Sequence, residues 1–425
     1  MTENKKIAVV GAGVIGLATA IDLQRAGFNV TLIDKDEPGM GASFGNAGLF
    51  ADYARLPFAR FATLFNMPGM LLDKESPLSL QGRYIPALLP YGMGFVKACQ
   101  EQNFKAGCIA LKALQEHTRA ADEQLFALTG AQDLVKAEGC LGLFGSQQGF
   151  DKAKQDDLHK RQQQGVNLQF LNAAEVHELE PDLADFYVGG VYYPDTRFTV
   201  SPLALCRRYF DYFIEQGGTF LQDRVLSLKP SKGPSTGSST SGGSHSARVQ
   251  MSRETLEYSQ VILTAGVASK SLLKPLGISI PLVSERGYHL TLDTAEKHLT
   301  RPVGWLDKAV FLTPMESGVR IAGTAEFAYE DAPASTDCTD NMLAHASHML
   351  GIQPEVKSDW VGSRPSTPDS LPVIGQLQQY PQITLAFGHG HLGLTLAAVT
   401  AQLVSELAQG QTPSLPLAPF APERF

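Results

Sequence analysis

The sequence predicts an α/β fold that is organised around a βαβ unit over residues 6–34. Three observations predict it. A short apolar run at residues 7–10 stands before a glycine turn, which is typical of a strand covered on both faces. An amphipathic helix follows that turn. A second apolar strand at residues 30–33 then ends in Asp34.

The glycine turn at residues 11–16 has the form GxGxxG. Gly11 allows a sharp turn, Gly13 lets the backbone approach a pyrophosphate, and Gly16 lets the helix pack closely on the strand. The free N–H groups and the positive dipole end of the helix would face the phosphates. The pattern therefore predicts a dinucleotide site; the alternative is a plain structural βαβ unit.

Asp34 ends the second strand, where a carboxylate accepts hydrogen bonds from ribose hydroxyls and repels a 2′-phosphate. NADP is therefore disfavoured, while the choice between FAD and NAD depends on later segments. Because strand, helix, second strand and acidic tip are in register, dinucleotide binding is favoured over the structural alternative. The expected contacts in this unit are Gly11, Gly13, Val14, Ile15, Gly16, Asp34 and Lys35.

The composition is that of an ordinary globular protein. The 425 residues, 44% of them hydrophobic and 18% charged, predict two or three domains with an ample core. The net charge is −8 and no Lys/Arg run stands out, which disfavours nucleic acid as a partner. The five cysteines are scattered without a CxxC, so neither a disulfide framework nor a metal site is expected.

The N-terminus leads directly into the first strand, so no signal peptide is expected, and no run of about 18 apolar residues suggests a membrane span. These features predict a cytoplasmic protein. Residues 50–100 are rich in Leu, Phe, Met and Pro. We favour a core segment of a second domain for this stretch. The alternative is a surface that touches a redox partner or the inner face of the cytoplasmic membrane.

A loop of small residues, PGMGASFGNAG, follows the βαβ unit at residues 38–48. It would expose backbone N–H groups and small hydroxyls to an anion or a flat ring; the alternative is an ordinary flexible loop. Together, GxGxxG, the acidic strand end and GASFGNAG resemble the FAD-dependent D-amino acid oxidase superfamily, in particular the bacterial D-amino acid dehydrogenase small-subunit type. The resemblance implies contacts with the pyrophosphate and the flavin ring at Ser43, Gly45, Asn46, Ala47 and Gly48.

The resemblance covers most of the chain and implies two domains. The FAD-binding domain, of the two-dinucleotide-binding type, would comprise residues 1–52, 195–275 and 360–425. The substrate domain, built on a mostly antiparallel sheet with helices, would comprise residues 53–194 and 276–359. Residues 230–246 are low-complexity Ser/Gly/Pro sequence, which predicts a flexible loop between two strands.

Two further segments resemble cofactor contacts of the same superfamily. The predicted strand at residues 219–228 matches one whose valine backbone touches the adenine, and Val225 stands at that position. A buried strand at residues 261–266 ends in the small residues Ala265 and Gly266. It resembles the second dinucleotide contact of two-dinucleotide-fold flavoproteins, and therefore favours FAD over NAD.

The segment FGHGHLGLT at residues 387–395 places a glycine loop before a long apolar helix. The N–H groups and dipole of such a helix start suit the flavin N1–C2=O edge, where negative charge gathers on reduction. His391 would face the substrate or cap the loop. No cysteine lies near, so we expect FAD to be held non-covalently. The resemblance implies cofactor contacts at Gly390, His391, Leu392, Gly393, Leu394 and Thr395.

Residues 361–375 hold the best candidate for a catalytic residue, Arg364. The segment resembles the G-x-RP-x-TPD-x-x-P-x-IG stretch of amine-oxidising flavoproteins, whose arginine grips the substrate carboxylate over the flavin ring. A guanidinium is a natural bidentate anchor for a carboxylate. The alternative role for Arg364 is an ion pair with Asp369 that holds the loop. In the strand at residues 284–290, Tyr288 is a second candidate for hydrogen bonding the carboxylate.

The resemblance implies oxidative deamination of a D-amino acid to the 2-oxo acid and ammonia, with hydride transfer from Cα to flavin N5 and electrons passed to a quinone or another acceptor. No protein base is required if the amine arrives neutral, which agrees with the lack of obvious paired carboxylates or a Ser-His-Asp set. Two alternatives remain open. One is an oxygen-using oxidase of glycine, sarcosine or a proline-like imino acid. The other is a flavin subunit that acts mainly with a partner protein.

Overall fold

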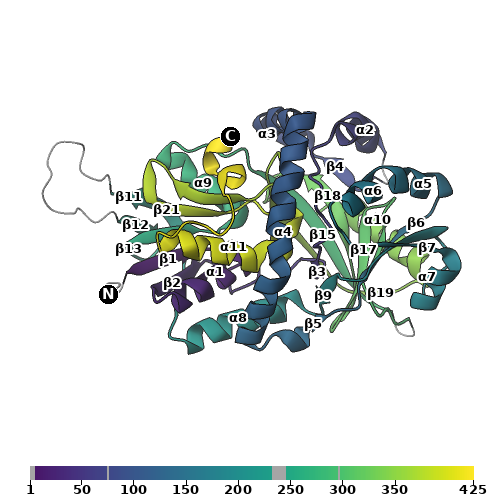
Figure 1. Cartoon of the computed structure of the whole chain (residues 1–425), viewed down its shortest axis with the longest axis horizontal. Coiled ribbons are helices and arrows are strands. Elements are labelled where there is room, and N and C mark those ends of the chain that lie inside the picture. The colour runs from purple at the N-terminus through teal and green to yellow at the C-terminus, as the bar shows by residue number, and fades with distance from the viewer. Residues whose placement is uncertain (1–4, 74–75, 232–245, 295–296) are drawn as a thin grey trace, which may run out of the picture.

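The computed structural model describes residues 5–73, 76–231, 246–294 and 297–425. Within them the strands form four sheets, two large and two small, and helices cover the large ones. Figure 1 shows the two large sheets in opposite halves of the molecule, with the long helix α4 running between them. Of the predicted loop at residues 230–246, residues 232–245 lie outside the described residues.

The first large sheet contains the predicted βαβ unit. Its six strands are parallel except for the pair β20 and β21, which is antiparallel. Helix α1 (Val14–Arg25) connects β1 to β2, so the prediction of this unit is confirmed. In spatial order the strands are β10 (Thr219–Gln222), β2 (Asn29–Asp34), β1 (Lys6–Val10), β14 (Gln260–Leu263), β21 (Tyr380–Phe387) and β20 (Val373–Leu377).

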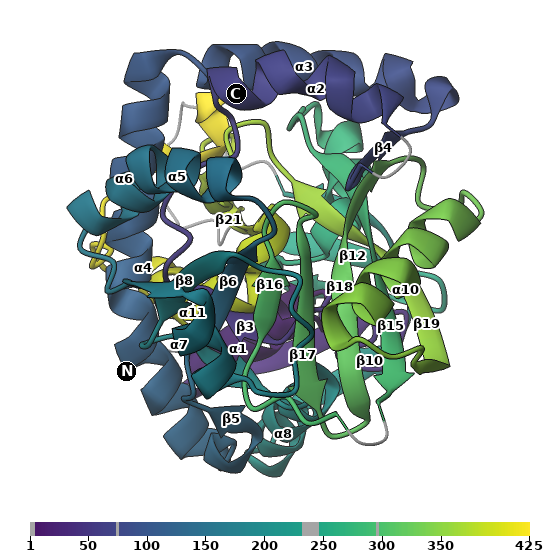
Figure 2. The ribbon, with the colours of Figure 1, turned by 90° about the vertical axis from the view of Figure 1, so that its right-hand side faces the viewer.

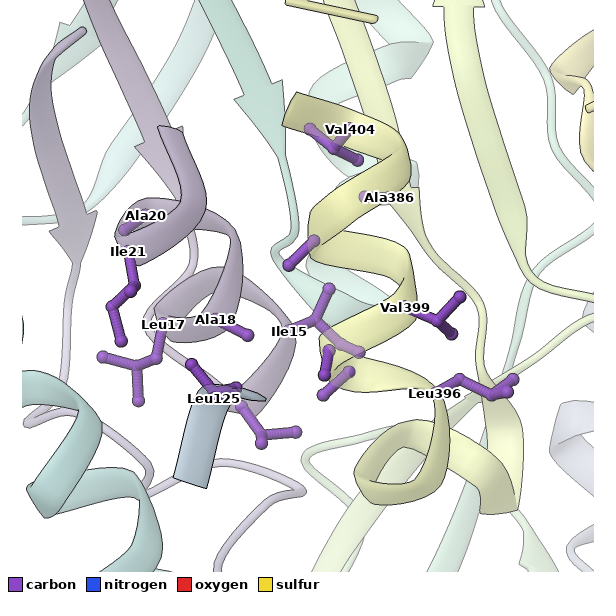
Figure 3. Packing of buried hydrophobic residues seen from close by; sticks show 14 of the residues in the cluster. Ile15, Leu17, Ala18, Ala20, Ile21, Leu125, Ala386, Leu396, Val399 and Val404 are labelled. Carbon is purple, nitrogen blue, oxygen red and sulfur yellow. The ribbon is translucent and has the colours of Figure 1, made fainter. Parts of the chain in front are cut away.

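One face of this sheet carries α1 and α11 (Gly393–Ala408), which pack side by side (Figure 3). Ile15 and Ala18 of α1 and Leu396 and Val399 of α11 belong to the same buried cluster, which Leu125 of α4 extends. Such burial, at about 25 cal/mol per Å² of apolar surface, is what fixes the two helices against each other. Both helices therefore begin at positions set by the core.

Among the described residues, Gly390–Ala408 is long and apolar enough to cross a membrane by length and composition. The sequence had not suggested such a run. However, 67% of the stretch is buried inside the protein, where it packs on α1 and α4. The run is accounted for as a core helix, because a helix that is apolar on nearly every side is expected wherever protein surrounds it.

The second large sheet is mostly antiparallel, as predicted; its parallel pairs are β6 with β16 and β4 with β18. Helix α10 packs on it through Met342, Ala346 and Met349. Its strands are β19 (Glu355–Ser366), β15 (Val283–Asp293), β18 (Gly318–Phe327), β17 (Val310–Met315), β16 (Val303–Trp305), β6 (Cys140–Phe144), β8 (Gly189–Tyr193) and β7 (Gln169–Asn172), with β4 (Leu78–Leu80) beside β18.

Two small antiparallel sheets complete the strands. The predicted strand at residues 219–228 is in fact two, because the chain turns between β10 and β11, and Val225 begins β11. One small sheet packs on the face of the six-stranded sheet opposite α1. Their strands are β11 (Val225–Pro230), β12 (Ala247–Met251) and β13 (Thr255–Tyr258), and β3 (Leu49–Phe50), β9 (Arg197–Thr199) and β5 (Val135–Lys136).

The remaining helices connect the two large sheets or cover them. The predicted boundary at residue 360 falls inside β19, and the division into two domains stays a prediction. The helices are α2 (Phe61–Leu72), α3 (Ile85–Ala98), α4 (Glu101–Thr129), α5 (Gln147–Gln155), α6 (Asp157–Gln163), α7 (Ala173–Leu179), α8 (Pro202–Glu215), α9 (Ser269–Leu273) and α10 (Thr336–Leu350).

Helices α2 and α3 lie together at one end of the molecule (Figures 1 and 2). Their apolar residues are largely exposed: Phe65 is 78% exposed and Met93 is 71% exposed, and only a small cluster around Phe95 is buried. The interpretation of residues 50–100 as a core segment is therefore wrong for α2 and α3. Many of their apolar side chains lie on an outer surface, and contact of this surface with a redox partner or a membrane stays a prediction.

Candidate active site

A large cavity, of about 1810 Å³, is lined by the six-stranded sheet, the nine-stranded sheet and helices α2 and α3. Pockets for one small molecule are usually about 300–1,000 Å³, so this cavity has room for a dinucleotide and a further ligand. Most of the predicted residues line it: Gly11, Gly13, Val14, Ile15, Asp34, Lys35, Ser43, Gly45, Asn46, Ala47, Val225, Ala265, Gly266, Arg364, Gly390, His391, Leu392, Gly393 and Leu394. Gly16, Gly48, Thr395 and Tyr288 do not.

The first part of the cavity is the turn between β1 and α1. Gly11 has a φ of 111°, in the region that favours glycine, and an added Cβ would lie 2.6 Å from the carbonyl oxygen of Thr264. Ser43 Oγ accepts a hydrogen bond of 2.9 Å from the N–H of Val14. Asp34 Oδ2 accepts one of 2.7 Å from the N–H of Ala12. The loop at residues 38–48 is thus tied to the glycine turn.

Gly16 lies behind this turn and supports it. An added Cβ at Gly16 would lie 1.8 Å from the carbonyl oxygen of Gly11. Real atoms do not approach so closely, so any side chain at residue 16 would push α1 away from β1. The predicted role of Gly16 in close helix packing is confirmed by this geometry.

The N-termini of α1 and α11 both meet the cavity. Their N-cap residues, Gly13 and Leu392, line it and give no side-chain cap of their own, while Ser43 Oγ accepts from the N–H of Val14 in the first turn of α1. Uncapped first-turn N–H groups and the positive dipole end attract anions and electron-rich edges. One end therefore fits a pyrophosphate and the other fits the pyrimidine edge of a flavin, so the residues present fit a flavin dinucleotide.

The loop at residues 43–48, which is predicted to contact the flavin, is hydrogen-bonded to the nine-stranded sheet. Arg320 of β18 donates from Nη1 to the carbonyl oxygens of Phe44, at 3.0 Å, and Asn46, at 2.8 Å. Thr313 Oγ1 of β17 donates to the carbonyl oxygen of Ala47 at 2.9 Å. Burial lowers the pKa of Arg320 to about 10, which still leaves it charged at neutral pH. The two large sheets are joined at the place where the predicted flavin loop lies.

Gly48 and Thr395 act from behind the cavity wall. The N–H of Gly48 donates to Asn46 Oδ1 at 2.7 Å, and Gly48 has a φ of 79°. Thr395 Oγ1, at the start of α11, accepts a 2.9 Å hydrogen bond from the N–H of Ala51. These residues fix the chain on either side of the flavin loop, and they do so without lining the cavity.

Arg364 lines the cavity from β19, directly opposite Glu285 of β15. Its Nη1 donates to the carbonyl oxygen of Thr324 at 2.9 Å and lies 3.5 Å from Glu285 Oε1. Thr324 has a φ of 61°, a strained conformation for a β-branched residue, and such strain gathers at functional sites. An added Cβ at Gly287 would lie 2.1 Å from Arg364 Nη2, so Gly287 provides the space for the guanidinium.

Glu285 connects Arg364 to the loop before α11. It is buried, and His391 Nε2 lies 2.6 Å from its Oε1, while Ser366 Oγ donates to its Oε2 at 2.7 Å. Burial alone would raise the pKa of Glu285, but His391 and Arg364 outweigh that effect and lower the pKa to about 2. Glu285 is therefore an anion at every physiological pH.

His391 lies on the solvent side of the Glu285–Arg364 pair. Its ring lies 5.1 Å from the ring of Phe58, and its side chain remains 37% exposed. The sequence left open whether His391 faces the substrate or caps the loop. Its Nε2 is held by Glu285 while its ring lines the cavity, so it ties the loop before α11 to β15 and forms part of the wall.

Tyr288 lies on the other face of β15 and does not line the cavity. Its side chain is 1% exposed; its hydroxyl donates to Glu326 at 2.6 Å and accepts from the N–H of Ser335. Arg286, on the same face, pairs with Glu326 at 3.1 Å. The prediction that Tyr288 contacts a substrate carboxylate is not supported, because its buried side chain lies on the face of β15 opposite to Glu285, which lines the cavity.

The alternative role considered for Arg364, an ion pair with Asp369, belongs to another arginine. Arg424 Nε lies 2.8 Å from Asp369 Oδ2, and its Nη2 donates to the carbonyl oxygen of Leu371 at 2.7 Å. Arg424 therefore holds the loop after β19. This leaves the guanidinium of Arg364 facing the cavity rather than folded into that loop.

Sequence reasoning missed several residues at the site: Glu285, Gly287, Arg320 and Trp360. Glu285 and Gly287 belong to the predicted strand at residues 284–290. Because side chains alternate along a strand, the sequence could have indicated that these two residues share one face. No local signal identifies Arg320 or Trp360. Their role depends on which strands lie beside the loop at residues 43–48, and that is a tertiary fact.

A family model described as FAD dependent oxidoreductase (DAO) matches residues 6–407. The D-amino-acid oxidase of Bradyrhizobium diazoefficiens is 31% identical over the full length of both chains. The D-amino acid dehydrogenase of Vibrio cholerae is 29% identical, with 96% of each chain covered. Among solved structures, the glycine oxidase of Geobacillus kaustophilus matches with a TM-score of 0.74 at 21% identity, covering 99% of both chains. With the site and these likenesses together, the chain belongs to the FAD dependent oxidoreductase (DAO) family, and its cofactor is FAD.

Proposed function

We propose that this protein is a D-amino acid dehydrogenase that converts a D-amino acid to the 2-oxo acid and ammonia. The observation that supports it best is the position of Arg364. Its guanidinium lines the cavity beside the loop before α11, where the helix start fits the flavin. A carboxylate held by Arg364 would bring the neighbouring Cα of an amino acid close to the oxidising cofactor. The stereochemistry is proposed from the curated relatives.

In this proposal the protein supplies position and field. When bound, FAD would supply the two-electron oxidation as the hydride acceptor. Arg364 would hold the carboxylate, and Glu285, 3.5 Å from its Nη1, helps to fix the guanidinium beside the cavity. The imino acid that results is hydrolysed by water to the 2-oxo acid and ammonia. No side chain is needed as a base when the amine arrives in its neutral form.

We further propose that the electron acceptor is a quinone. We also propose that this protein is cytoplasmic and makes peripheral contact with the inner face of the cytoplasmic membrane. The exposed apolar surface of α2 and α3 supports both ideas, because it offers an apolar molecule a path to the cavity. Leu89 and Met93 belong both to that surface and to the cavity lining. The alternatives are oxygen as acceptor, in an oxidase of glycine or a proline-like imino acid, and a flavin subunit that works mainly through a partner protein.

The test is to mix the purified flavoprotein anaerobically with D- and L-amino acids, glycine, sarcosine and proline, and to follow the loss of the oxidised flavin absorbance. Rapid bleaching by D-amino acids is expected. A second measurement compares turnover with a soluble quinone against oxygen uptake with peroxide formation. No bleaching by any D-amino acid would contradict the proposal, whereas bleaching with fast peroxide formation would favour the oxidase.

The Arg364→Ala variant tests the role of the arginine. Hydrogen bonds to a charged group contribute about 1.5–3 kcal/mol each, so loss of a bidentate pair should raise the KM for amino acids by roughly 100-fold or more. The FAD content should stay at the wild-type level, measured from the flavin absorbance of the purified protein. An unchanged KM in a variant that holds its full FAD would remove Arg364 from this role.

A further inference from the structure

Arginines other than Arg364 also line the cavity. Arg161 of α6 lies there together with Arg60, Asp157, Tyr53 and Tyr193, and we call these five residues the α6 end of the cavity. The family resemblance gave no role to any of them. The group contains two arginines and one aspartate, so it carries a surplus positive charge.

Of the two arginines at the α6 end, one forms an ion pair within the residues that the structure describes and the other does not. Arg60 Nη1 forms an ion pair with Asp157 Oδ1. Arg161 has no carboxylate partner within the described part of the chain; its Nη1 reaches only the hydroxyl of Tyr193, at 3.4 Å. A charged group inside a protein is normally neutralised by a partner, because removal from water is unfavourable. An unpaired guanidinium that lines a cavity therefore points to an anionic ligand.

The guanidinium of Arg161 is held in place by aromatic rings. Its Cζ lies 5.2 Å from the ring of Tyr53 and 5.9 Å from the ring of Tyr193. The two rings stack on each other with 4.2 Å between their centroids and 15° between their planes. Cation–π contacts of this kind orient a guanidinium without neutralising its charge. The site is thus organised before a ligand arrives, which favours binding.

The α6 end adjoins the part of the cavity that contains Arg364 rather than the ribose end at Asp34. Phe58 packs its ring 5.1 Å from the ring of His391, which contacts Glu285. Arg60 follows Phe58 by two residues, and two residues of chain span at most about 7 Å. Apolar residues that line the same cavity include Leu64, Met67, Phe144, Leu158 and Leu306.

We propose that the α6 end is a subsite for an anionic group at the far end of the substrate, with Arg161 as the residue that binds it. The preferred substrates would then be amino acids whose side chain is an aliphatic chain that ends in a carboxylate. The chain would cross the apolar lining while Arg364 holds the α-carboxylate. This inference rests on the proposed function, because it uses Arg364 as the first anchor.

The experiment measures kcat/KM for a series of D-amino acids with side-chain carboxylates: aspartate, glutamate, 2-aminoadipate and 2-aminopimelate. Each is compared with its neutral side-chain amide. At one chain length the acid should exceed the amide by about tenfold or more, since a hydrogen bond to a charged group contributes about 1.5–3 kcal/mol. If the amide is as good a substrate as the acid at every length, the proposal is overturned.

Variants then assign the effect to Arg161. Arg161→Gln should abolish the preference for the acid over the amide, while Arg161→Lys should retain part of the preference. Lys160→Ala is the matched control, because it removes a positive charge from the neighbouring residue, which pairs with Asp156 at the surface. A preference that survives Arg161→Gln, or that is lost equally in Lys160→Ala, would contradict the assignment.

A binding measurement separates this inference from the proposed function. Aliphatic dicarboxylates and monocarboxylates of equal chain length are titrated into the oxidised flavoprotein, and binding is followed from the change in flavin absorbance. A dicarboxylate that binds about tenfold more tightly, with the advantage lost in Arg161→Gln, supports the subsite even if no amino acid is oxidised. Equal binding of both ligands, together with normal oxidation of neutral amino acids, overturns the subsite alone.

Discussion

At the scale of single residues, the orientation of Arg364 depends on the strand beside it. Gly287 leaves the space that the guanidinium occupies, Thr324 turns its carbonyl oxygen toward it, and Glu285 stands directly opposite in the register. Cross-strand neighbours of opposite charge stabilise each other, so the ion pair follows from the pairing of β15 with β19. These three neighbouring residues together set the orientation of the Arg364 guanidinium.

The Gly287→Ala variant should displace the guanidinium, because the new Cβ would lie 2.1 Å from Nη2. We expect the KM for amino acids to rise at least tenfold while the FAD content stays normal. Steady-state kinetics and flavin absorbance measure the two quantities. Gly82→Ala is the control, since an added Cβ there meets nothing within 4 Å. Equal KM values for the two variants would contradict the role given to Gly287.

Glu285 gives the protein a pH dependence of known sign. Its pKa is lowered from 4.5 to about 2 in the folded protein, so its contribution to stability is fully present above about pH 4.5 and is lost as the pH falls toward 2. Urea unfolding of the wild type and of Glu285→Gln should therefore give stability curves that converge over this window. Curves that stay parallel from pH 5 to pH 3 would show that the pKa of Glu285 is not lowered.

The residues that sequence reasoning found and missed divide along physical lines. Gly11 and Asp34 were predicted from the GxGxxG turn and the strand that follows it, and Ser43 was predicted from the family resemblance. Arg364 was found from the family resemblance, and its partner Glu285 was not. The segment SERGYHL alternates, but nothing in it says which face meets the cavity, so Tyr288 was chosen from the wrong face.

At the scale of secondary structure, α1 and α11, which both begin at the cavity, also pack against each other in the core. Periodicity and glycine spacing predicted both α1 and α11, because each is long and its first turn follows a glycine loop. The sequence could not predict their contact, since that depends on β1, β14 and β21 being neighbours in one sheet. The position of each helix start is thus set by packing far from the cofactor.

Gly16 and Gly13 allow the effects of packing and binding to be separated. In Gly16→Ala the new Cβ would meet the carbonyl oxygen of Gly11 at 1.8 Å, whereas in Gly13→Ala it would meet only Ser43 Oγ, at 3.3 Å. We expect Gly16→Ala to lower both the FAD content and the stability of the protein stripped of FAD. Gly13→Ala should lower mainly the FAD content. Thermal unfolding with and without FAD measures both; equal loss of apoprotein stability would contradict this.

At the scale of the whole molecule, the main lesson concerns α2 and α3. Composition alone could not decide between core and surface for residues 50–100, because both contain apolar residues. The structure shows exposed apolar side chains on these helices, next to a cavity that they also line. The fold class was predictable from strand and helix patterns, while the location of this surface required the full three-dimensional arrangement.

Replacing the exposed residues Phe65, Leu89 and Met93 by serine tests the function of this surface. Because these side chains are largely exposed, the free energy of unfolding should change little for each substitution. Binding to lipid vesicles and turnover with a quinone should both fall, while anaerobic flavin reduction by amino acids should be kept. Vesicle flotation and quinone-linked kinetics measure these effects. Undiminished flotation and quinone turnover in the triple variant would contradict the proposed contact.

Arg424 has a practical consequence for handling the protein. Its guanidinium binds Asp369 and the carbonyl oxygen of Leu371, in the loop that follows β19. Arg364 lies on β19, two residues before that strand ends. Proteolysis that removes residue 424 would break these contacts and loosen the chain just beyond Arg364.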